Sequence, residues 1–265
     1  DIFSRTLDTE LTIQCNYVEI YMEHIRDLLV QPSEELSKPL KIRELNVPDE
    51  NGYKKFTYIE GCNTCTVRNL KQVNKVLKFG NKVRATGTTN LNEHSSRSHA
   101  VYILSLDQLN RDTNVRLTSR IFLVDLAGSE RVKDSGVTDI GFKEACTINK
   151  SLSELSLVVK SLVENSSHIP YRNSKLTHIL SDALGGNSKT AIILTVNPED
   201  KVNTVNTLKF GLRVKNLKNK AEKNVELSID AYKKIISQLR KEILDLKLIL
   251  ESPAPTPNRR IELQT

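Results

Sequence analysis

Alternation of apolar and polar residues predicts several β-strands in the first half of the chain. The clearest alternating stretches are residues 12–21, 40–45, 56–67 and 99–109. Residues 48–52 contain a proline and a glycine and separate the second stretch from the third, so we expect these two strands to form a protruding hairpin. Residues 24–30 are interpreted as a short turn or a helix end.

Two almost uninterrupted apolar runs predict strands that are buried within a sheet. The first is residues 121–124, which lead into Asp125, and the second is the TAIILTV run within residues 189–196, which Asn197 and Pro198 end. Helices are expected between and after these runs, over residues 69–84, 148–162, 174–184 and 204–216, with the third closed by two glycines. The alternation of strands and helices indicates an α/β fold with a largely buried sheet.

A heptad pattern marks the last helical segment. Apolar residues recur at alternating spacings of four and three: Tyr232, Ile236, Leu239, Ile243, Leu246 and Leu250. This is an a/d heptad seam of the kind found in coiled coils, but it covers less than three heptads, so a monomeric amphipathic helix is almost as good an interpretation. The SPAPTP sequence that follows predicts a flexible hinge.

The composition favours one large core and an acidic binding partner. The chain has 265 residues, is 38% hydrophobic and carries a formal net charge of +7. Such a charge is typical of proteins that bind nucleic acid, anionic membranes or acidic protein surfaces, although a basic face can also serve solubility alone. Aromatic and basic residues are not interleaved, which argues against nucleic acid. No apolar stretch is long enough to cross a bilayer, which argues against membrane insertion.

The cysteines indicate packing rather than metal binding. Cys62 and Cys65 form a C-x-x-C pair, but no second pair follows at the spacing of a zinc site. Their segment alternates as a strand, so we expect them to contribute to a core. With no signal peptide in the sequence, a reducing, cytosolic setting fits.

A carboxylate and a glycine follow the first apolar run. Asp125 stands where that strand ends, in the sequence VDLAGSER, and a carboxylate there suits an indirect contact with Mg²⁺. Gly128 has no Cβ, so its backbone N–H can approach a terminal phosphate closely. Alone this pattern is weak, and an ordinary exit from a strand explains it equally well.

A second polar loop, NEHSSRSH over residues 92–99, carries complementary chemistry. A serine hydroxyl can bind Mg²⁺, the γ-phosphate or the attacking water, although a serine-rich capping loop before a strand is also common. Together the two loops are more informative. Arg97 and Glu130 carry opposite charges and can close as a bidentate ion pair that orients a water molecule and opens after hydrolysis.

Four long motifs in a fixed order then resemble one family. NEHSSRSHA, LVDLAGSER, EACTINKSL and PYRNSKLTHILSDALGGNSKT are similar to segments of the kinesin motor domain, over residues 1–219 and on through the neck. The resemblance implies the P-loop NTPase-like kinesin motor fold, with a mostly parallel or mixed central sheet between helices, followed by a helical neck. It divides the chain into a partial motor domain (1–216), a neck linker (217–230), a neck helix or short coiled coil (231–251) and a hinge (252–265). The neck resembles that of plus-end-directed kinesins.

The resemblance also assigns roles in ATP hydrolysis. Ser95 and Ser96 are expected to contact the γ-phosphate and Mg²⁺, and Gly128 to sense the γ-phosphate. Asp125 is expected to reach Mg²⁺ through water, as the second metal-binding residue beside Ser96. The expected catalytic group is Glu130, Arg97 and Asn92, with Glu130 positioning the water.

A microtubule-binding surface is implied in the same way. Residues 150–164 are similar to the helix that lies on the microtubule, and the resemblance extends to basic positions expected to contact tubulin: Lys133, Lys150, Arg172, Lys175 and His178. His178 replaces an arginine that is common in the family, which is expected to weaken binding. From charge alone, a solvated basic face would be the better interpretation. Contacts with tubulin are expected to weaken as salt rises.

The phosphate loop that kinesins use is missing from this sequence. No G-x-x-x-x-G-K-[ST] stretch occurs, and the nearest segment, residues 185–190, lacks the glycine before its lysine. In the family this loop and the first strands precede the position that matches Asp1. We therefore expect part of an ordinary microtubule-stimulated ATPase of the cytoplasm and the microtubule cytoskeleton, without ATP turnover in this chain alone. A non-catalytic module for microtubule binding or homodimer formation is the alternative.

Overall fold

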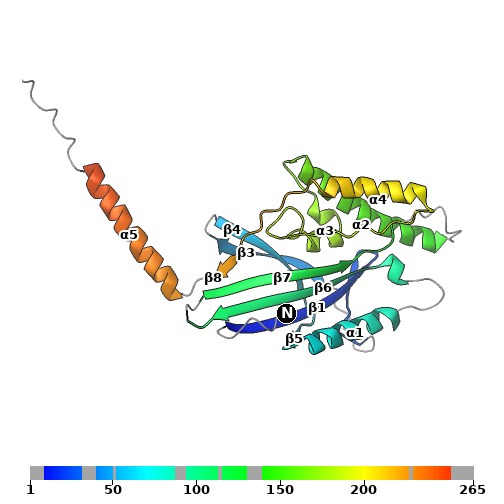
Figure 1. Cartoon of the computed structure of the whole chain (residues 1–265), viewed down its shortest axis with the longest axis horizontal. Coiled ribbons are helices and arrows are strands. Elements are labelled where there is room, and N and C mark those ends of the chain that lie inside the picture. Colours follow the sequence, from blue (N-terminus) through cyan, green and yellow to red (C-terminus); the bar gives the residue numbers. More distant parts are fainter. Residues whose placement is uncertain are drawn as a thin grey trace, which may run out of the picture.

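The structure is a computed structural model that describes residues 9–31, 40–49, 52–86, 94–112, 115–129, 139–226 and 229–251. Its main sheet contains β1 (Thr9–Tyr21), β2 (His24–Asp27), β5 (Cys65–Val67), β6 (His99–Asn110), β7 (Val115–Asp125) and β8 (Asn224–Glu226). The strand order is β2-β1-β6-β7-β8, and β5 also pairs with β1. Figure 1 shows β1, β6 and β7 side by side. Together with its helices, this sheet confirms the α/β class.

The resemblance implies a mostly parallel or mixed sheet, and the described strands contain no parallel pair. Every pair among the described strands is antiparallel. A short connection forces this at β6 and β7, where Asn110 pairs with Val115, because a parallel pair needs a much longer crossover. A short connection also makes β2 an antiparallel strand beside β1. The prediction of a turn or helix end at residues 24–30 was therefore wrong for residues 24–27. Met22 and Glu23 have positive φ angles of 48° and 61°, so a tight hairpin turn joins β1 to β2.

Neither apolar run is buried as predicted. Residues 189–197 form no strand, and the side chain of Ile193 is 91% exposed. Leu123 of β7 is 53% exposed, because β8 pairs with β7 only from Arg116 to Thr118. The rest of that edge has no partner among the described strands. The apolar side chains of such a run are buried only where the strand is flanked by others in a sheet and helices cover the faces of that sheet.

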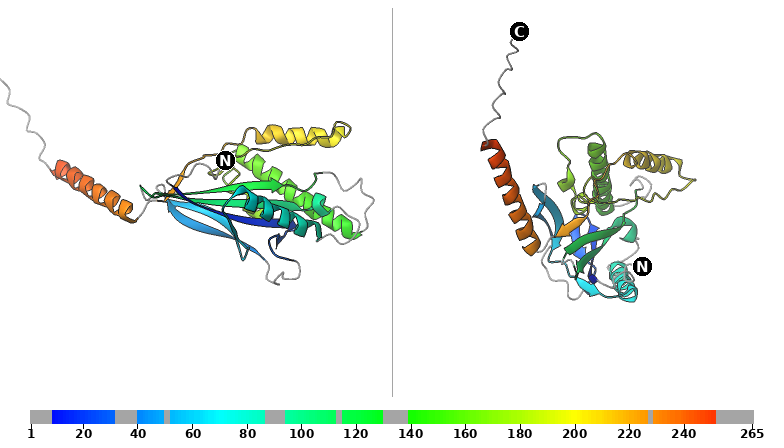
Figure 2. Two further views of the ribbon diagram at one scale, coloured as in Figure 1. Left: turned by 60° about the horizontal axis from the view of Figure 1, so that its bottom comes forward. Right: turned by 60° about the vertical axis from the view of Figure 1, so that its left-hand side comes forward.

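The predicted hairpin is present as a separate two-stranded sheet. It consists of β3 (Lys41–Asp49) and β4 (Gly52–Glu60), which pair along their whole length, whereas β5 joins the main sheet instead. In Figure 2 the hairpin projects beside the main sheet.

Helices cover both faces of the main sheet, because successive side chains of a strand point to opposite faces. Tyr17 of β1 packs toward α1 (Leu70–Thr86), while Val18 packs toward α2 (Asp139–Val163) and α3 (Lys175–Ile179). Figure 1 shows α1 on one side and α2, α3 and α4 (Lys201–Val214) on the other. The core therefore has two halves, one on each face of β1 and β6.

The remaining elements are short or lie apart from this core. The short helices η2 (His94–Arg97) and η4 (Tyr171–Asn173) lie before β6 and α3. The helix α3 is shorter than the predicted 174–184, since turns follow it up to Gly185, whose φ angle is +76°. The C-terminal helix α5 (Ile229–Glu251) extends away from the sheet (Figures 1 and 2). No helix among the described residues has both the length and the apolar character needed to cross a membrane.

The cysteines pack as predicted. Cys15 is fully buried in the half of the core on the α1 side, and Cys65 packs against the same cluster. Cys62 packs against the other half, and all three are free thiols. Burial is the main reason that the pKa of Cys62 is raised, and the negative charge of Asp27 adds to it. This thiol is therefore a packing group of low reactivity.

Candidate nucleotide-switch site

The two polar loops of the sequence meet at one end of the β6–β7 hairpin. Antiparallel register places Ala100, at the start of β6, opposite Asp125, at the end of β7. The loop before β6 and the loop after β7 are therefore neighbours, although the connection between the strands lies at the far end. The N–H of Gly128 donates a hydrogen bond of 2.8 Å to the carbonyl of Ser96, which joins the loops directly.

A buried arginine holds the strand ends beneath these loops. Arg84, in the last turn of α1, is 8% exposed. Its Nη1 donates to Oδ2 of Asp125 at 2.7 Å, and its Nη2 donates to the carbonyl of Ser98 at 2.9 Å. Its Nε lies 3.6 Å from Oε1 of Glu19, a carboxylate with 1% of its side chain exposed. Arg84 thus connects α1, β1, β6 and β7 at the edge of the site.

Sequence reasoning missed Arg84, although a signal was present. It lies four residues after Gly80 and seven after Leu77, on the stripe of α1 that faces the sheet. A cation on the apolar face of an amphipathic helix needs an ionic or polar partner in the core. The pattern therefore pointed to a buried ion pair, but not to Asp125 as a member of it.

A histidine connects the second loop to α2. His99 and Ser151 are each 3% exposed, and the Nε2 of His99 lies 2.6 Å from the hydroxyl of Ser151. The N–H of Ala127 donates to Nδ1 of the same ring at 3.0 Å. Burial lowers the pKa of His99 to about 4; the positive charge of Arg84 adds to this, and Asp125 opposes it. The ring is therefore neutral at physiological pH.

The structure describes some of the predicted nucleotide-site residues. Ser95, Ser96 and Arg97 lie in η2, where Ser96 and Arg97 are half-buried. The side chain of Asp125 is 71% exposed, and Gly128 is half-buried. Asn92, Glu130 and Lys133 lie outside the described residues. The Arg97–Glu130 ion pair therefore stays a prediction.

Two of the predicted tubulin-binding residues gather around one carboxylate. Arg172 holds Glu44 of β3 with two hydrogen bonds, Nε to Oε1 at 3.1 Å and Nη2 to Oε2 at 2.8 Å. The Nε2 of His178 lies 3.0 Å from Oε1 of the same carboxylate. The hydrogen bond from Arg172, with a smaller contribution from His178, lowers the pKa of Glu44 to about 2. Lys150 and Lys175 are exposed on α2 and α3 and are not part of this cluster.

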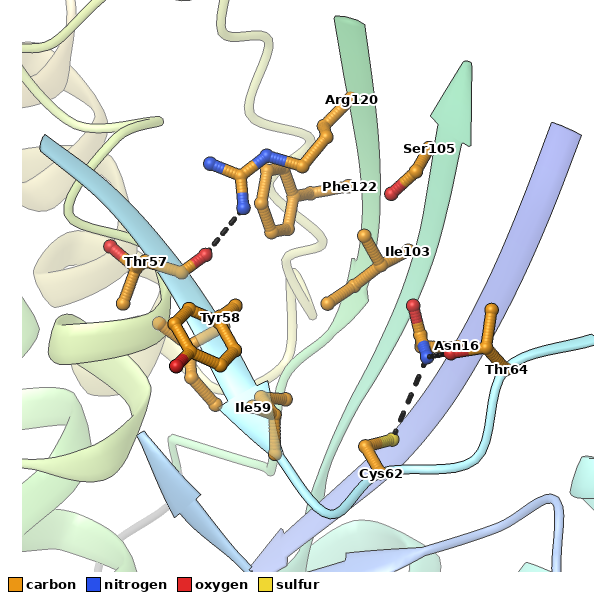
Figure 3. A pocket seen from close by; sticks show the side chains of 11 residues that line it. Asn16, Thr57, Tyr58, Ile59, Cys62, Thr64, Ile103, Ser105, Arg120 and Phe122 are labelled. Atoms are coloured by element: carbon orange, nitrogen blue, oxygen red, sulfur yellow. Dashed lines mark hydrogen bonds between the residues drawn. The ribbon is translucent and has the colours of Figure 1, made fainter. Parts of the chain in front are cut away.

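A separate pocket of about 190 Å³ lies between the hairpin and the main sheet (Figure 3). Arg120 of β7 enters it and donates to the carbonyl of Thr57 and to Oδ2 of Asp182. Figure 3 also shows the amide of Asn16 bonded to Thr64 and Cys62. Because its cation is already paired with a carboxylate, the pocket is better explained as space between two packed sheets than as an anion site.

The segment before α5 is attached to the sheet by asparagines. Asn224 in β8 donates to the carbonyl of Thr118 at 3.1 Å and accepts from Nδ2 of Asn187 at 2.9 Å. The side chain of Asn219 accepts from the N–H of Gly185 at 2.8 Å and donates to the carbonyl of Ala183 at 3.1 Å. These contacts hold the segment against β7 and the turns after α3.

The family model of the kinesin motor domain matches residues 1–217. The chain belongs to the kinesin motor family. Its sequence is 39% identical to the kinesin heavy chain of Neurospora crassa over 245 residues, which cover 91% of this chain and 25% of that protein. It is 36% identical to kinesin heavy chain isoform 5C of Homo sapiens, covering 94% of this chain and 25% of that one.

Solved kinesin structures have the same fold. A fast kinesin aligns with a TM-score of 0.73 and 41% identity, over 86% of this chain and 62% of that one. A KIF14 dimer, in the two-heads-bound state with AMP-PNP and in complex with a microtubule, aligns with a TM-score of 0.71 and 36% identity, over 83% of this chain and 62% of that one. This kinesin chain thus spans about a quarter of the curated relatives' length and under two thirds of the matched structures. The kinesin motor family is a nucleotide-binding family of the P-loop ATPase type.

Proposed function

We propose that the full-length protein is a microtubule-based motor that couples ATP hydrolysis to movement along microtubules in the cytoplasm. The observation that carries this proposal is the hydrogen bond of 2.8 Å between Gly128 and Ser96. It joins the two motifs that resemble the γ-phosphate-sensing loops of kinesins. Family membership and the microtubule complex of a relative support the partner.

The loops can respond to a phosphate because their contact is exchangeable. The N–H of Gly128 already donates to Ser96, so a γ-phosphate oxygen that binds this N–H must replace the carbonyl as acceptor. In this proposal Ser95 and Ser96 contact the phosphate, and Arg97 pairs with Glu130. That ion pair orients the attacking water, with Asn92 beside it. After hydrolysis the phosphate leaves, and the loops return to their direct contact.

The residues present also fit Mg²⁺ as the cofactor. Mg²⁺ prefers oxygen ligands, and this end of the sheet provides the Ser96 hydroxyl and the exposed Asp125 carboxylate. In our proposal Ser96 binds the ion directly and Asp125 through water. When bound, the ion neutralises charge on the phosphates. Arg84 keeps Oδ2 of Asp125 at a fixed position, which orients the carboxylate before any metal binds.

The proposed microtubule surface consists of basic residues on α2, η4 and α3 and in the segment before α2. Lys150, Lys175 and Arg172 are exposed, and His178 lies beside Arg172 on Glu44. Lys133 is assigned to the same surface from the sequence alone. The net charge of +7 supports an acidic partner such as tubulin.

We also propose that the neck connects the motor to a second copy. Residues 217–230 serve as the neck linker, which β8 attaches to β7, and residues 231–251 serve as the neck helix before a hinge at 252–265. The described seam residues are about half exposed: Tyr232, Ile236, Leu239, Ile243 and Leu246. An exposed apolar seam on an isolated helix suits a homodimer through a short coiled coil.

Hydrolysis and movement by the full-length protein test the proposal. Surface-bound protein is expected to move microtubules in the presence of Mg-ATP. Glu130→Ala is expected to abolish movement and nearly abolish turnover while ATP still binds. Asp112→Asn, which changes an exposed carboxylate just after β6, at the end of the β6–β7 hairpin away from both loops, is the control and should leave turnover unchanged. Absence of microtubule binding by the wild type, at low salt and with any nucleotide, would refute the proposal.

A further inference from the structure

One imidazole ring bridges the nucleotide-facing loop and the helix that resembles the microtubule-facing one. Its Nδ1 accepts from the backbone of Ala127, the residue before Gly128. Its Nε2 contacts the hydroxyl of Ser151, near the middle of α2.

The direction of both hydrogen bonds follows from the chemistry of the groups. A backbone N–H can only donate, so Nδ1 of His99 must be the unprotonated nitrogen. In a neutral ring the proton then lies on Nε2, which donates to the Ser151 hydroxyl. Both side chains are 3% exposed, so water cannot readily replace either contact, and losing one leaves a buried polar group unsatisfied.

The ring is held by the rigid part of the molecule. His99 is the first residue of β6 and pairs with Ile20 of β1, while its neighbour Ala100 pairs with Asp125 of β7. The backbone of His99 is thus fixed in the centre of the sheet. When residues 126–129 move, Ala127 moves relative to the fixed backbone of His99. The imidazole ring can then keep its bond to Ala127 only by rotating, and this rotation changes its contact with Ser151.

We propose that His99 is a positioning residue that transmits the arrangement of residues 126–129 to α2. The inference rests on the proposed function, because it assumes that these residues respond to nucleotide and that α2 lies on the microtubule. The inference adds a physical link between the two sites. The neutral imidazole of His99 accepts a hydrogen bond from Ala127, in the nucleotide-facing loop, and donates one to Ser151, in α2. His99 itself touches neither nucleotide nor tubulin in this proposal.

Variants can remove each end of the link separately. Asparagine at position 99 can place its amide oxygen near the position of Nδ1, which keeps the acceptor for Ala127 but is too short for Ser151. Glutamine can place its amide nitrogen near the position of Nε2, which reaches Ser151 but leaves Ala127 unpaired. Ser151→Ala removes the far acceptor with the smallest change in volume. Ser161→Ala, at a second buried serine of α2, is the matched control.

The measurement is the dissociation constant of the full-length protein for microtubules in ADP, divided by the same constant in AMP-PNP. This ratio reports how strongly the nucleotide changes microtubule affinity. Linked sites typically change each other's affinity about 5- to 150-fold. We expect His99→Asn, His99→Gln and Ser151→Ala each to reduce this ratio at least about fivefold, and the His99→Asn/Ser151→Ala pair to reduce it no further. Ser161→Ala should keep the wild-type ratio. Unfolding temperatures of the variants show whether a loss of coupling is separate from a loss of stability.

The outcomes separate this inference from the proposed function. If the wild type binds microtubules with a nucleotide-dependent affinity and His99→Asn and Ser151→Ala keep that dependence, the inference is wrong while the motor function stands. If the wild type shows no microtubule binding, the proposed function itself fails. A further measurement needs no variant: nitrogen NMR of the histidine rings at pH 7 should show His99 protonated at Nε2. Protonation at Nδ1 would overturn the inference.

Discussion

Replacing Arg84 tests whether the site is supported by a buried charge network. Arg84→Met keeps much of the side-chain volume and removes the guanidinium. In general, removing one partner of a buried ion pair costs about 3–5 kcal/mol, because the other charge stays buried and loses the partner that compensated it. A domain is stable by about 5–15 kcal/mol, so this change should remove a large part of the stability.

The contacts do not contribute equally to that cost. Asp125 is 71% exposed, so water can replace its contact with Arg84, and such a pair is worth only about 0–1 kcal/mol. Glu19 is 1% exposed and retains the guanidinium of Arg26, whose Nη1 is 3.7 Å from Oε2. The Ser98 carbonyl loses a charged donor, which is worth about 1.5–3 kcal/mol. We therefore expect most of the cost of Arg84→Met to come from Glu19 and Ser98.

Urea unfolding followed by circular dichroism measures the cost. Arg84→Met is expected to lower the free energy of unfolding by about 3–5 kcal/mol, and Asp125→Asn by about 1 kcal/mol or less. Glu19→Gln combined with Arg84→Met should recover part of the loss, because it removes a buried carboxylate that has lost one of its two arginine partners. A cost below about 1 kcal/mol for Arg84→Met, or an equal cost for Asp125→Asn, would refute the reasoning.

Three further predictions concern packing, pH and the neck. Gly80→Ala should lower stability by about 1–3 kcal/mol in thermal melts despite the better helix propensity of alanine, since its Cβ would lie 2.2 Å from the ring of Tyr17. The pKa of His99 is about 4 in the folded protein, against the ordinary histidine value of 6.5 in the unfolded chain, so the unfolded chain binds the proton first as pH falls. The contribution of His99 to the free energy of unfolding is then fully present above pH 6.5, and up to about 3 kcal/mol of it is lost as the pH falls toward 4. Urea titrations at several pH values should show this loss. Asn224→Ala should speed amide hydrogen exchange in β8, because it removes the contact with Thr118.

Each of these predictions has a control and a contradicting result. Lys78→Ala, at an exposed position of α1, should leave the melting temperature unchanged, and a Gly80→Ala protein as stable as the wild type would contradict the packing argument. His99→Gln should flatten the acid loss of stability; an unchanged slope would assign it to other groups. Asn206→Ala, on the exposed face of α4, should leave exchange in β8 unaffected.

The sequence predicted the parts of the fold that depend on local periodicity. The strand at residues 12–21 and the helix at 69–84 were found because one face of each is buried and the other is polar. The prediction failed where burial depends on distant neighbours. Ile193 lies in a run typical of a central strand, yet nothing among the described strands pairs with it, so it is 91% exposed.

The sequence also predicted some residues of the candidate site and missed others. Ser96 and Gly128 were identified from motif chemistry, and the structure joins their loops by a hydrogen bond. Arg84 and Ser151 were missed, because each acts through a partner that is distant in sequence. Periodicity indicates which side of α1 or α2 is buried, but only strand register shows what that side meets.

The β6–β7 hairpin has a consequence for how the site can be studied. The loop before β6 and the loop after β7 lie at the same end of the hairpin. A donor dye on the first loop and an acceptor dye on the second would therefore report when the two loops separate. The other end of the hairpin, where Asn110 pairs with Val115, is far from the loops, and the connection there is a natural place for a tether or an inserted tag. Inserting one residue within a strand would instead turn every following side chain of that strand to the opposite face of the sheet and separate the two loops from their shared partners.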